Sequence, residues 1–426
     1  MNRFVAEVAD ALADCPVIDT HEHLRPLSAV EPMSLGKLFS DSFVRLALRA
    51  PDGSPNSYGA ALALEIDDDW RFVEPIVRRV RYNSFYRWLA EGLWELYGLG
   101  PADSEFDERV WKHLALEIPR RYETGSWLAD VLDRAHVESV VWDPFWHAGT
   151  TAVPDPRFHP MLRIDSSLVA FHPKARDFEG NNARTWSEAL GVDVKGMDDL
   201  EELFVRLLDA NVAGGARSLK LCVAYDRTLA VGRVTRTTAA GILGRSPADV
   251  SREDALAFGD YVIRFYLDQA RERGLVVQMH TGQARLDSSN PLLLEPILQD
   301  YPEVVFDLLH GGFPWTAETA ALAHAYPNVR LNLVWLPQIS SEAAVQALKV
   351  WIQVIADVRH ISWGGDARSP EEMYGGLLAG KHVLARAFGE LVDVGYIDID
   401  AAVDGARAIL YDSGAETYGL GGGKTL

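Results

Sequence analysis

Two histidines one residue apart, His21 and His23, follow a short apolar run near the start of the chain. Other polar side chains that can do chemistry stand at the ends of later apolar runs: Lys220, His280, His310 and Asp366. Imidazole nitrogen suits zinc and related divalent ions, and carboxylate oxygen adds a hard ligand. Unrelated histidines have no reason to recur at the same end of several strands. The sequence therefore predicts that four residues act together as the ligands of one metal cluster: His21, His23, His280 and Asp366.

Lys220 and His310 leave the number of metal ions open. An ammonium group cannot ligate a cation, but burial lowers the pKa of a lysine. Neutral Lys220 can react with carbon dioxide to give a carbamate, whose oxygens would bridge two metals; the alternatives are an ion pair with Asp366 or a contact to a substrate carboxylate. His310 is then a ligand of the second metal if Lys220 is carboxylated, and otherwise a general base or transition-state donor.

The elements that position these residues are short β-branched runs alternating with helical segments. Residues 3–14 have the pattern of a helix that ends before Pro16. The first predicted strand begins at Val17, and seven more are predicted over residues 137–146, 161–171, 216–225, 275–283, 304–312, 329–337 and 360–370. Apolar strands that alternate with helices indicate a parallel sheet covered on its faces. Eight such units predict an α/β fold of the (β/α)8 TIM-barrel type, with an open doubly wound sheet as the alternative.

The same pattern divides the chain. Residues 1–23 and 136–415 are predicted to form the barrel, and residues 24–135, rich in helical periodicity and aromatic residues, a helical insertion after the first strand. The insertion is a candidate subunit interface of a homo-oligomer. Residues 416–426 have the composition of a flexible tail. In a barrel of this type the chemistry sits at the carboxyl ends of the strands, where the polar residues above are found.

Composition excludes several classes of partner. The formal net charge of −20 argues against nucleic acid and anionic membranes, although a few arginines in a pocket still suit a small anionic substrate. No apolar run approaches the length of a membrane span, and residues 1–16 lack the apolar core of a signal peptide. Cys15 and Cys222 both lie in apolar runs, as expected of reduced, buried thiols in a cytoplasmic protein.

The substrate is predicted to be a small molecule that bears a carboxylate. Four residues near the strand ends are candidates to bind it: Arg163, Tyr225, Arg227 and Arg368. A structural ion pair is the alternative for each arginine. Metal binding lowers the pKa of water toward neutrality. Asp366 is expected to take the proton of that water, and His310 to polarise the substrate carbonyl.

The set of residues resembles the amidohydrolase superfamily: HxH on the first strand, then Lys220, His280, His310 and Asp366 on later ones. Within that superfamily the stretches "SLKLCVAYDRTL" and "VQMHTGQARLDSSNPLLLEPIL" resemble the amidohydrolase-like domain of nodulin/glutamine-synthetase-like fusion proteins. The stretches "YNSFYRWLAEGLWELYGL", "WDPF", "RID" and "GGDARSP" are similar to uronate isomerases. The resemblance implies a metal-dependent barrel enzyme with one or two ions, zinc being the expected metal.

The main functional hypothesis is a hydrolase that uses metal-activated water to cleave an amide, lactone or ester. Two other enzyme functions fit the same residues: non-oxidative decarboxylation with one metal, or aldose–ketose isomerisation of a uronic acid. A barrel that has lost catalysis and serves as a binding module is the non-enzyme alternative, and it predicts missing ligands.

Overall fold

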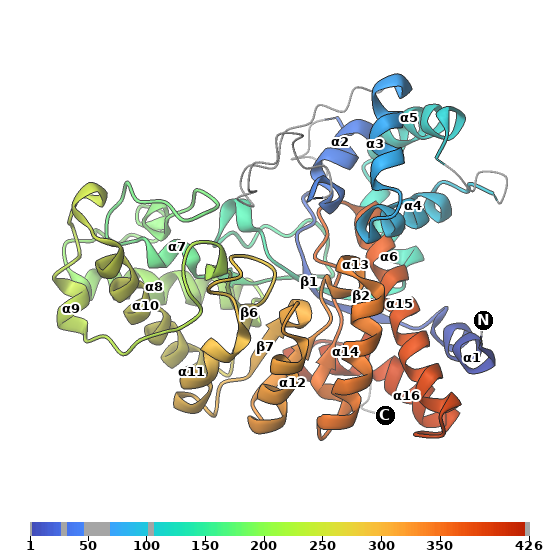
Figure 1. Cartoon of the computed structure of the whole chain (residues 1–426). Coiled ribbons are helices and arrows are strands. Elements are labelled where there is room, and N and C mark those ends of the chain that lie inside the picture. The colour runs from blue at the N-terminus through green and yellow to red at the C-terminus, as the bar shows by residue number, and fades with distance from the viewer. Residues whose placement is uncertain (1, 27–31, 47–68, 101–105, 422–426) are drawn as a thin grey trace.

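Nine parallel strands surrounded by helices make up the part of the chain that positions the candidate ligands (Figure 1). The structure, a computed structural model, describes residues 2–26, 32–46, 69–100 and 106–421. The strands are β1 (Val17–Glu22), β2 (Val137–Trp142), β3 (Phe158–Pro160), β4 (Leu162–Arg163), β5 (Ser218–Leu221), β6 (Val276–His280), β7 (Phe306–Leu309), β8 (Val329–Asn332) and β9 (Ile361–Ser362). Nearly every strand residue is buried, which explains why the strands are almost continuous apolar runs in the sequence.

Hydrogen bonds join the strands into a ring. Pairing runs from β1 to β3 and from β4 to β9, and only Met161, whose N–H donates to the carbonyl of Trp142, separates β3 from β4. At the other gap, Thr20 N–H donates to the carbonyl of Trp363 (3.2 Å) and Asp366 N–H to that of His21 (2.8 Å). With β3 and β4 counted as one interrupted strand, eight strands close the predicted (β/α)8 barrel.

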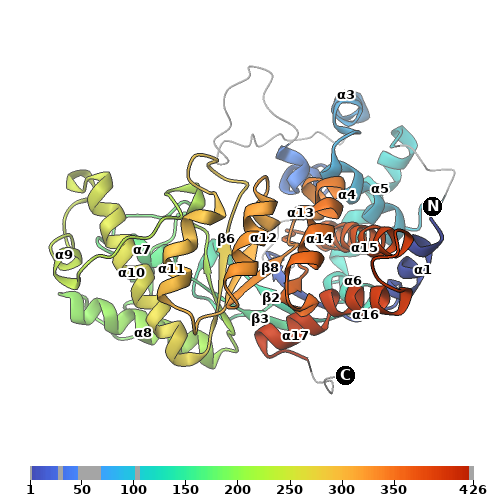
Figure 2. The same cartoon turned by 60° about the horizontal axis from the view of Figure 1, so that its bottom comes forward.

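The helices of the barrel cover the outside of this ring (Figures 1 and 2). They are α7 (Asp165–Leu168), α8 (Met197–Ala213), α9 (Arg236–Ala240), α10 (Arg252–Arg273), α11 (Glu295–Asp300), α12 (Thr316–Ala325), α13 (Leu336–Ile339), α14 (Ser341–Val354), α15 (Pro370–Asp393), α16 (Ile399–Leu410) and α17 (Asp412–Tyr418). The helix α1 (Arg3–Leu12) packs against α15 and α16. One predicted strand is placed wrongly: residues 161–171 contain only the end of the third strand, because α7 begins at Asp165 and turns the apolar residues after it toward α10.

All the regular secondary structure that is described between β1 and β2 is helical. The helices are α2 (Leu35–Asp41), the 3-10 helix η2 (Phe43–Leu46), α3 (Trp70–Val80), α4 (Ser84–Leu96), α5 (Glu108–Glu123) and α6 (Trp127–Arg134). Asp69 caps α3 by accepting from the N–H of Arg71, and an Asn83 cap begins α4. Helix α4 lies along α15, so this region packs against the barrel where its eighth strand ends (Figure 1).

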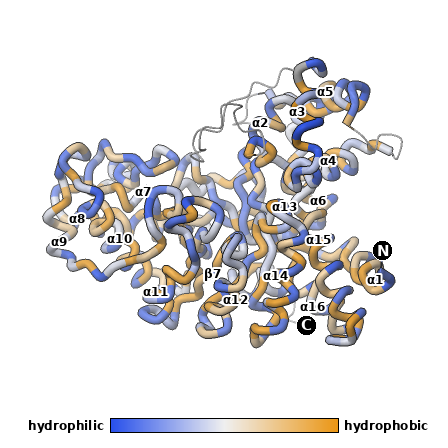
Figure 3. Tube along the Cα trace, in the orientation of Figure 1, coloured by the Kyte–Doolittle hydropathy of each residue, from blue (hydrophilic) through white to orange (hydrophobic). Residues whose placement is uncertain are grey.

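The C-terminal residues are more ordered than expected. Helix α17 includes the first residues of the segment predicted as a tail, and Tyr418 is buried against the strands. Residues 422–426 lie outside the described residues. Hydrophobic and hydrophilic stretches alternate along the helices (Figure 3), and none of the described helices is long and apolar enough to cross a membrane. Cys15 and Cys222 are both buried free thiols, as predicted.

Candidate metal centre

The six predicted metal ligands line one cavity of about 70 Å³ at the carboxyl ends of the strands: His21, His23, Lys220, His280, His310 and Asp366. They come from β1, β5, β6, the residue after β7 and the loop after β9. Parallel strands in a closed barrel bring their carboxyl ends to one place, which is why residues more than 300 positions apart in the chain meet here. Arg163, Tyr225 and Arg368 line the same cavity.

Hydrogen bonds fix how His21 and His23 are oriented. The Nδ1 atom of His21 lies 2.7 Å from Oε1 of Gln278, and Nδ1 of His23 lies 2.8 Å from the carbonyl oxygen of Asp143. Both partners are acceptors, so each Nδ1 carries a proton, and in the neutral form of the ring each Nε2 presents a lone pair. A metal-binding histidine usually donates its other ring N–H to an acceptor in this way, which holds the ring in position.

Both lone pairs point at one carboxylate. Asp366 Oδ1 lies 3.0 Å from Nε2 of His23 and 3.7 Å from Nε2 of His21. Among the described residues, these three are the group whose ligand atoms all lie within 4.8 Å of one another. Unprotonated nitrogens that face a carboxylate oxygen repel it unless a cation lies between them. The donor set therefore fits a divalent metal ion.

His280 and His310 form a second pair beside this group. Their Nδ1 and Nε2 atoms, respectively, are 2.8 Å apart, and His280 Nε2 lies 3.2 Å from the carbonyl oxygen of Gln283. The buried Nδ1 of His310 has no hydrogen bond among the described residues and lies 3.7 Å from Oδ2 of Asp366. The structure thus places His280 next to the three-residue group but in contact with His310, so its role as a ligand stays a prediction.

Lys220 is buried next to the same group. Its side chain is 1 % exposed, and its Nζ lies 3.5 Å from Nε2 of His21. Burial lowers the pKa of Lys220, and no carboxylate of the described chain forms an ion pair with it. Burial also lowers the pKa values of His21, His280 and His310, so these imidazoles are neutral, the form that binds metals.

Backbone strain is concentrated at this cavity. Four described residues other than glycine have left-handed φ angles, and three of them line it: His310 (65°), Trp335 (63°) and Asp366 (59°). Such conformations cost about 1–3 kcal/mol each and persist only where the surrounding structure imposes them. Because these strained residues lie at the ends of three strands, we infer that the direction of their side chains is maintained at the cost of an unfavourable backbone conformation.

The predicted substrate-binding residues differ in the contacts that their side chains already make within the protein. Arg163 pairs with buried Asp143 (Nη1 to Oδ2, 3.3 Å), so its charge is already balanced. Tyr225 stacks on Phe178 with ring centroids 5.2 Å apart, and its ring lies 4.8 Å from that of His280. The guanidinium of Arg368 lies over the ring of Phe145 at 5.1 Å.

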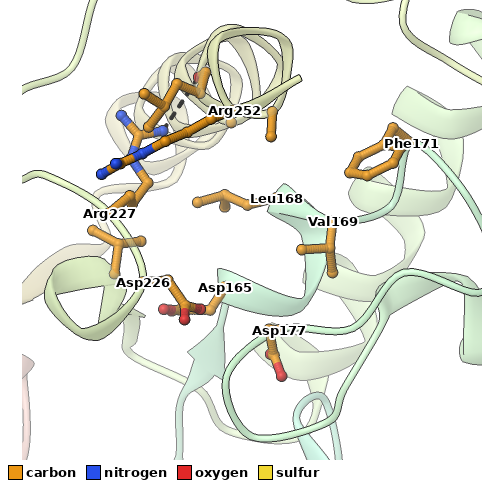
Figure 4. A pocket seen from close by; sticks show the side chains of 12 residues that line it. Asp165, Leu168, Val169, Phe171, Asp177, Asp226, Arg227 and Arg252 are labelled. Atoms are coloured by element: carbon orange, nitrogen blue, oxygen red, sulfur yellow. Dashed lines mark hydrogen bonds between the residues drawn. The ribbon is translucent and has the colours of Figure 1, made fainter. Parts of the chain in front are cut away.

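Arg227 is a wrong prediction. Its guanidinium pairs with Asp260 of α10 and donates to the carbonyl oxygens of Thr228, Leu256 and Ala230. It lines a separate cavity of about 150 Å³, next to α10 (Figure 4). The chain turns through the 3-10 helix η6 (Val223–Tyr225) directly after β5, and this turn carries residue 227 away from the metal group.

Two supporting residues were missed although a signal for them exists. Gln278 lies two residues before His280 on β6, so side-chain alternation places both on the inner face. Asp143 follows the end of β2, the same position that identified the ligands on other strands.

Asp19 and Glu22 are buried side by side and accept backbone hydrogen bonds from Gly365 and Ala367, respectively. Burial raises the pKa of both carboxyl groups. This pair ties β1 to the loop that carries Asp366.

Other cavity residues had no signal in the sequence. Phe43, Arg45 and Leu46 reach the cavity from η2, and Phe178 and Glu179 from the loop after α7. Their placement depends on loop conformation, which alternation and periodicity do not predict.

A closed (β/α)8 barrel with histidines and an aspartate at its strand ends is the architecture of a metal-binding barrel. Residues 200–374 match the family model Amidohydrolase, and this segment carries Lys220, His280, His310 and Asp366. This segment is thus similar to the amidohydrolase family, and the resemblance predicted from the sequence is confirmed. A stretch of 150 residues, 34 % of this chain, is 32 % identical to protein fluG of Emericella nidulans, and covers 17 % of that protein.

Solved structures are similar over nearly the whole chain. A uronate isomerase from Thermotoga maritima superposes with a TM-score of 0.77 over 98 % of both chains, at 16 % identity. A glucuronate isomerase from Caulobacter crescentus gives 0.73 (98 % of this chain, 94 % of that chain) and a putative metal-dependent hydrolase from Lactobacillus casei ATCC 334 gives 0.66 (97 % of both), each at 16 % identity. At this identity the likeness concerns the fold.

Proposed function

We propose that this protein is a metal-dependent hydrolase that cleaves an amide, lactone or ester bond of a small, carboxylate-bearing substrate with water. The observation that carries the proposal is the convergence of the Nε2 atoms of His21 and His23 on the carboxylate of Asp366. The amidohydrolase-family match supports it, because it covers the segment that contributes Asp366.

Zinc is the metal we propose, held by His21, His23 and Asp366, because imidazole and carboxylate together suit that ion. A bound divalent ion supplies two kinds of chemistry: it lowers the pKa of water toward neutrality, and it polarises a carbonyl oxygen. Lys220, buried and of lowered pKa, is suited to carboxylation, which would add an oxygen ligand for a second ion. His280 and His310 are the nitrogen ligands nearest to that position.

The residues of the chain have separate roles in this proposal. Asp366 is the proton acceptor at its Oδ2, the oxygen that faces His310 rather than His23. His310 orients the substrate carbonyl through its Nδ1, the ring nitrogen without a hydrogen bond to any described residue. Arg368 binds the substrate carboxylate, and the Tyr225–Phe178 stack forms one wall of the cavity. Together these groups hold the reacting bond beside the proton acceptor.

One observation favours a second candidate. In the structure His280 and His310 lie 2.8 Å apart, and neither belongs to the compact group of His21, His23 and Asp366. That arrangement suits one metal ion, and with it aldose–ketose isomerisation or non-oxidative decarboxylation of an acid. The similarity in fold to uronate isomerases is in line with the isomerase alternative.

The test is a screen of carboxylate-bearing lactones, amides and esters with metal-loaded protein in water enriched in oxygen-18. Hydrolysis places one heavy oxygen in the product acid, while isomerisation leaves the mass of the substrate unchanged apart from exchange at its carbonyl, and decarboxylation releases carbon dioxide. We expect turnover with label in the product and at least about a 100-fold loss in Asp366→Asn. Turnover without bond cleavage by water would refute the hydrolase.

A further inference from the structure

Two arginines in the cavity have guanidinium groups with no hydrogen bond to the described residues. Arg45 comes from η2, between β1 and β2, and Arg368 from the loop after β9; both line the cavity of the metal centre. The Nε atom of each is inaccessible to solvent and has no acceptor among the described residues. A guanidinium carries five N–H donors, and buried donors are normally satisfied. Acceptors for these two groups are therefore expected from a ligand.

The two guanidinium groups are neighbours. Both lie near the ring of Phe43, with the Cζ of Arg45 at 6.0 Å and that of Arg368 at 5.7 Å from its centroid. Burial lowers the pKa of Arg45 to about 10, and the charge of Arg368 adds to this effect. Two like charges held together in a partly buried place repel each other, and an anion between them removes that cost.

The nearby carboxylates Glu372 and Glu179 form no ion pair with either arginine among the described residues, although both, with Asp41, act on the charge of Arg45 through space. Glu372, on α15, accepts hydrogen bonds from the backbone N–H groups of Phe43 (2.6 Å) and Arg368 (3.0 Å) instead. Glu179 also lines the cavity, but it forms no ion pair with either arginine in the described structure. Glu372 thus has another effect: it holds η2 and the loop after β9 together, so that both arginines face the same space.

We propose that Arg45 and Arg368 form a clamp for an oxyanion, a carboxylate or phosphate group carried by the substrate. The inference deepens the proposed function, on which it rests for the reaction. It assigns the selection of acidic substrates to a residue from the segment between β1 and β2 as well as to the barrel. Planar guanidinium groups bind two oxygens of one anion through paired N–H donors, which is the geometry that such a clamp needs.

Isothermal titration of the full chain with malonate and with inorganic phosphate tests the clamp. We expect binding to weaken by at least about tenfold in Arg45→Met and in Arg368→Met, since hydrogen bonds to charged groups contribute strongly. Arg45→Lys, which keeps the charge but loses the fork, should fall between wild type and Arg45→Met. Arg271→Met, on the exposed surface of α10, is the matched control and should bind like wild type. The tighter of the two anions identifies the acidic group as carboxylate or phosphate.

Metal content and far-UV circular dichroism, measured on the same preparations, separate this inference from the function itself. Anion binding that is equal in Arg45→Met and wild type, or absent from wild type, overturns the clamp even if metal is bound. If anion binding depends on Arg45 but the protein has no affinity for metal, the clamp is supported and the proposed hydrolase function is refuted. An Arg45→Met protein with wild-type circular dichroism and metal content, but weak anion binding, is the expected result.

Discussion

Glu371 is expected to be the main polar anchor between the barrel and the helices that follow β1. Its side chain, at the start of α15, is fully buried and accepts three hydrogen bonds. The donors are the hydroxyl of Tyr97 (2.7 Å), the hydroxyl of Tyr122 (2.8 Å) and the indole N–H of Trp127 (2.8 Å). All three donors come from residues between β1 and β2, so replacing Glu371 leaves three buried donors on the helical region unsatisfied.

The size of the effect follows from those donors. A buried donor left without an acceptor costs about 1–3 kcal/mol, so Glu371→Leu, which leaves three such donors, should lose about 3–9 kcal/mol. The entropy of unfolding is about 2.1 cal/mol/K per residue, which for this chain means that the Tm falls by roughly 1.1 °C per kcal/mol. Glu371→Leu should therefore lower the Tm by about 3–10 °C. Glu371→Gln keeps an acceptor oxygen for two donors and should lower it by no more than about 2 °C.

Differential scanning calorimetry at neutral pH, on preparations of equal metal content, measures both shifts. Glu303→Leu, an exposed position with the same change in side chain, is the control and should stay within about 1 °C of wild type. The reasoning is refuted if Glu371→Leu melts with wild type, or if Glu371→Leu and Glu371→Gln are destabilised equally, since the lost acceptor would then not be the cause.

Three further predictions concern stability and loop geometry. Arg227→Met should lower the Tm by about 3–5 °C, because it leaves Asp260 buried without its partner, while metal content stays unchanged; a loss of metal would contradict the placement of Arg227 outside the centre. Burial raises the pKa of Glu372 to about 7 from its ordinary 4.5, so the folded protein holds this proton more strongly and its contribution to stability falls, by up to about 3 kcal/mol, as pH rises from 4.5 to 7. The decrease in Tm between pH 5 and pH 7 should shrink in Glu372→Gln, and an unchanged decrease would count against this account. Gly282→Ala should reduce metal affinity or folding yield, because Gly282, two residues after His280, has a φ of +76° and an added Cβ would lie 2.3 Å from the backbone oxygen of Phe313; a variant with wild-type yield and metal content would disprove this.

The sequence was sufficient for the barrel and for the residues at its strand ends. Alternation of apolar runs and helices placed seven of the eight strands, and the rule that chemistry sits at carboxyl ends brought six residues to one cavity. This rule failed at Arg227, where the three-residue 3-10 helix η6 redirects the chain after β5. Alternation also misjudged residues 164–171, whose apolar pattern fits a strand as well as the short helix α7.

Contacts between distant segments could not be predicted from local patterns. Arg45 reaches the cavity only because the buried Glu372 binds the backbone of Phe43, a contact across 329 positions of the chain. Glu371 similarly collects donors from three separate helical segments. Nothing in the pair Glu371–Glu372 distinguishes it, in the sequence, from the acidic first turn of any helix.

Metal content of the purified protein tests the central claim most directly. Elemental analysis should find at least one divalent ion per chain in wild type, and the same amount in His113→Ala, whose histidine lies on the exposed side of α5. His23→Ala removes an Nε2 donor that lies 3.0 Å from Asp366, and should lose most of the metal after dialysis. Full retention of metal by His23→Ala, at the wild-type level, would contradict the account.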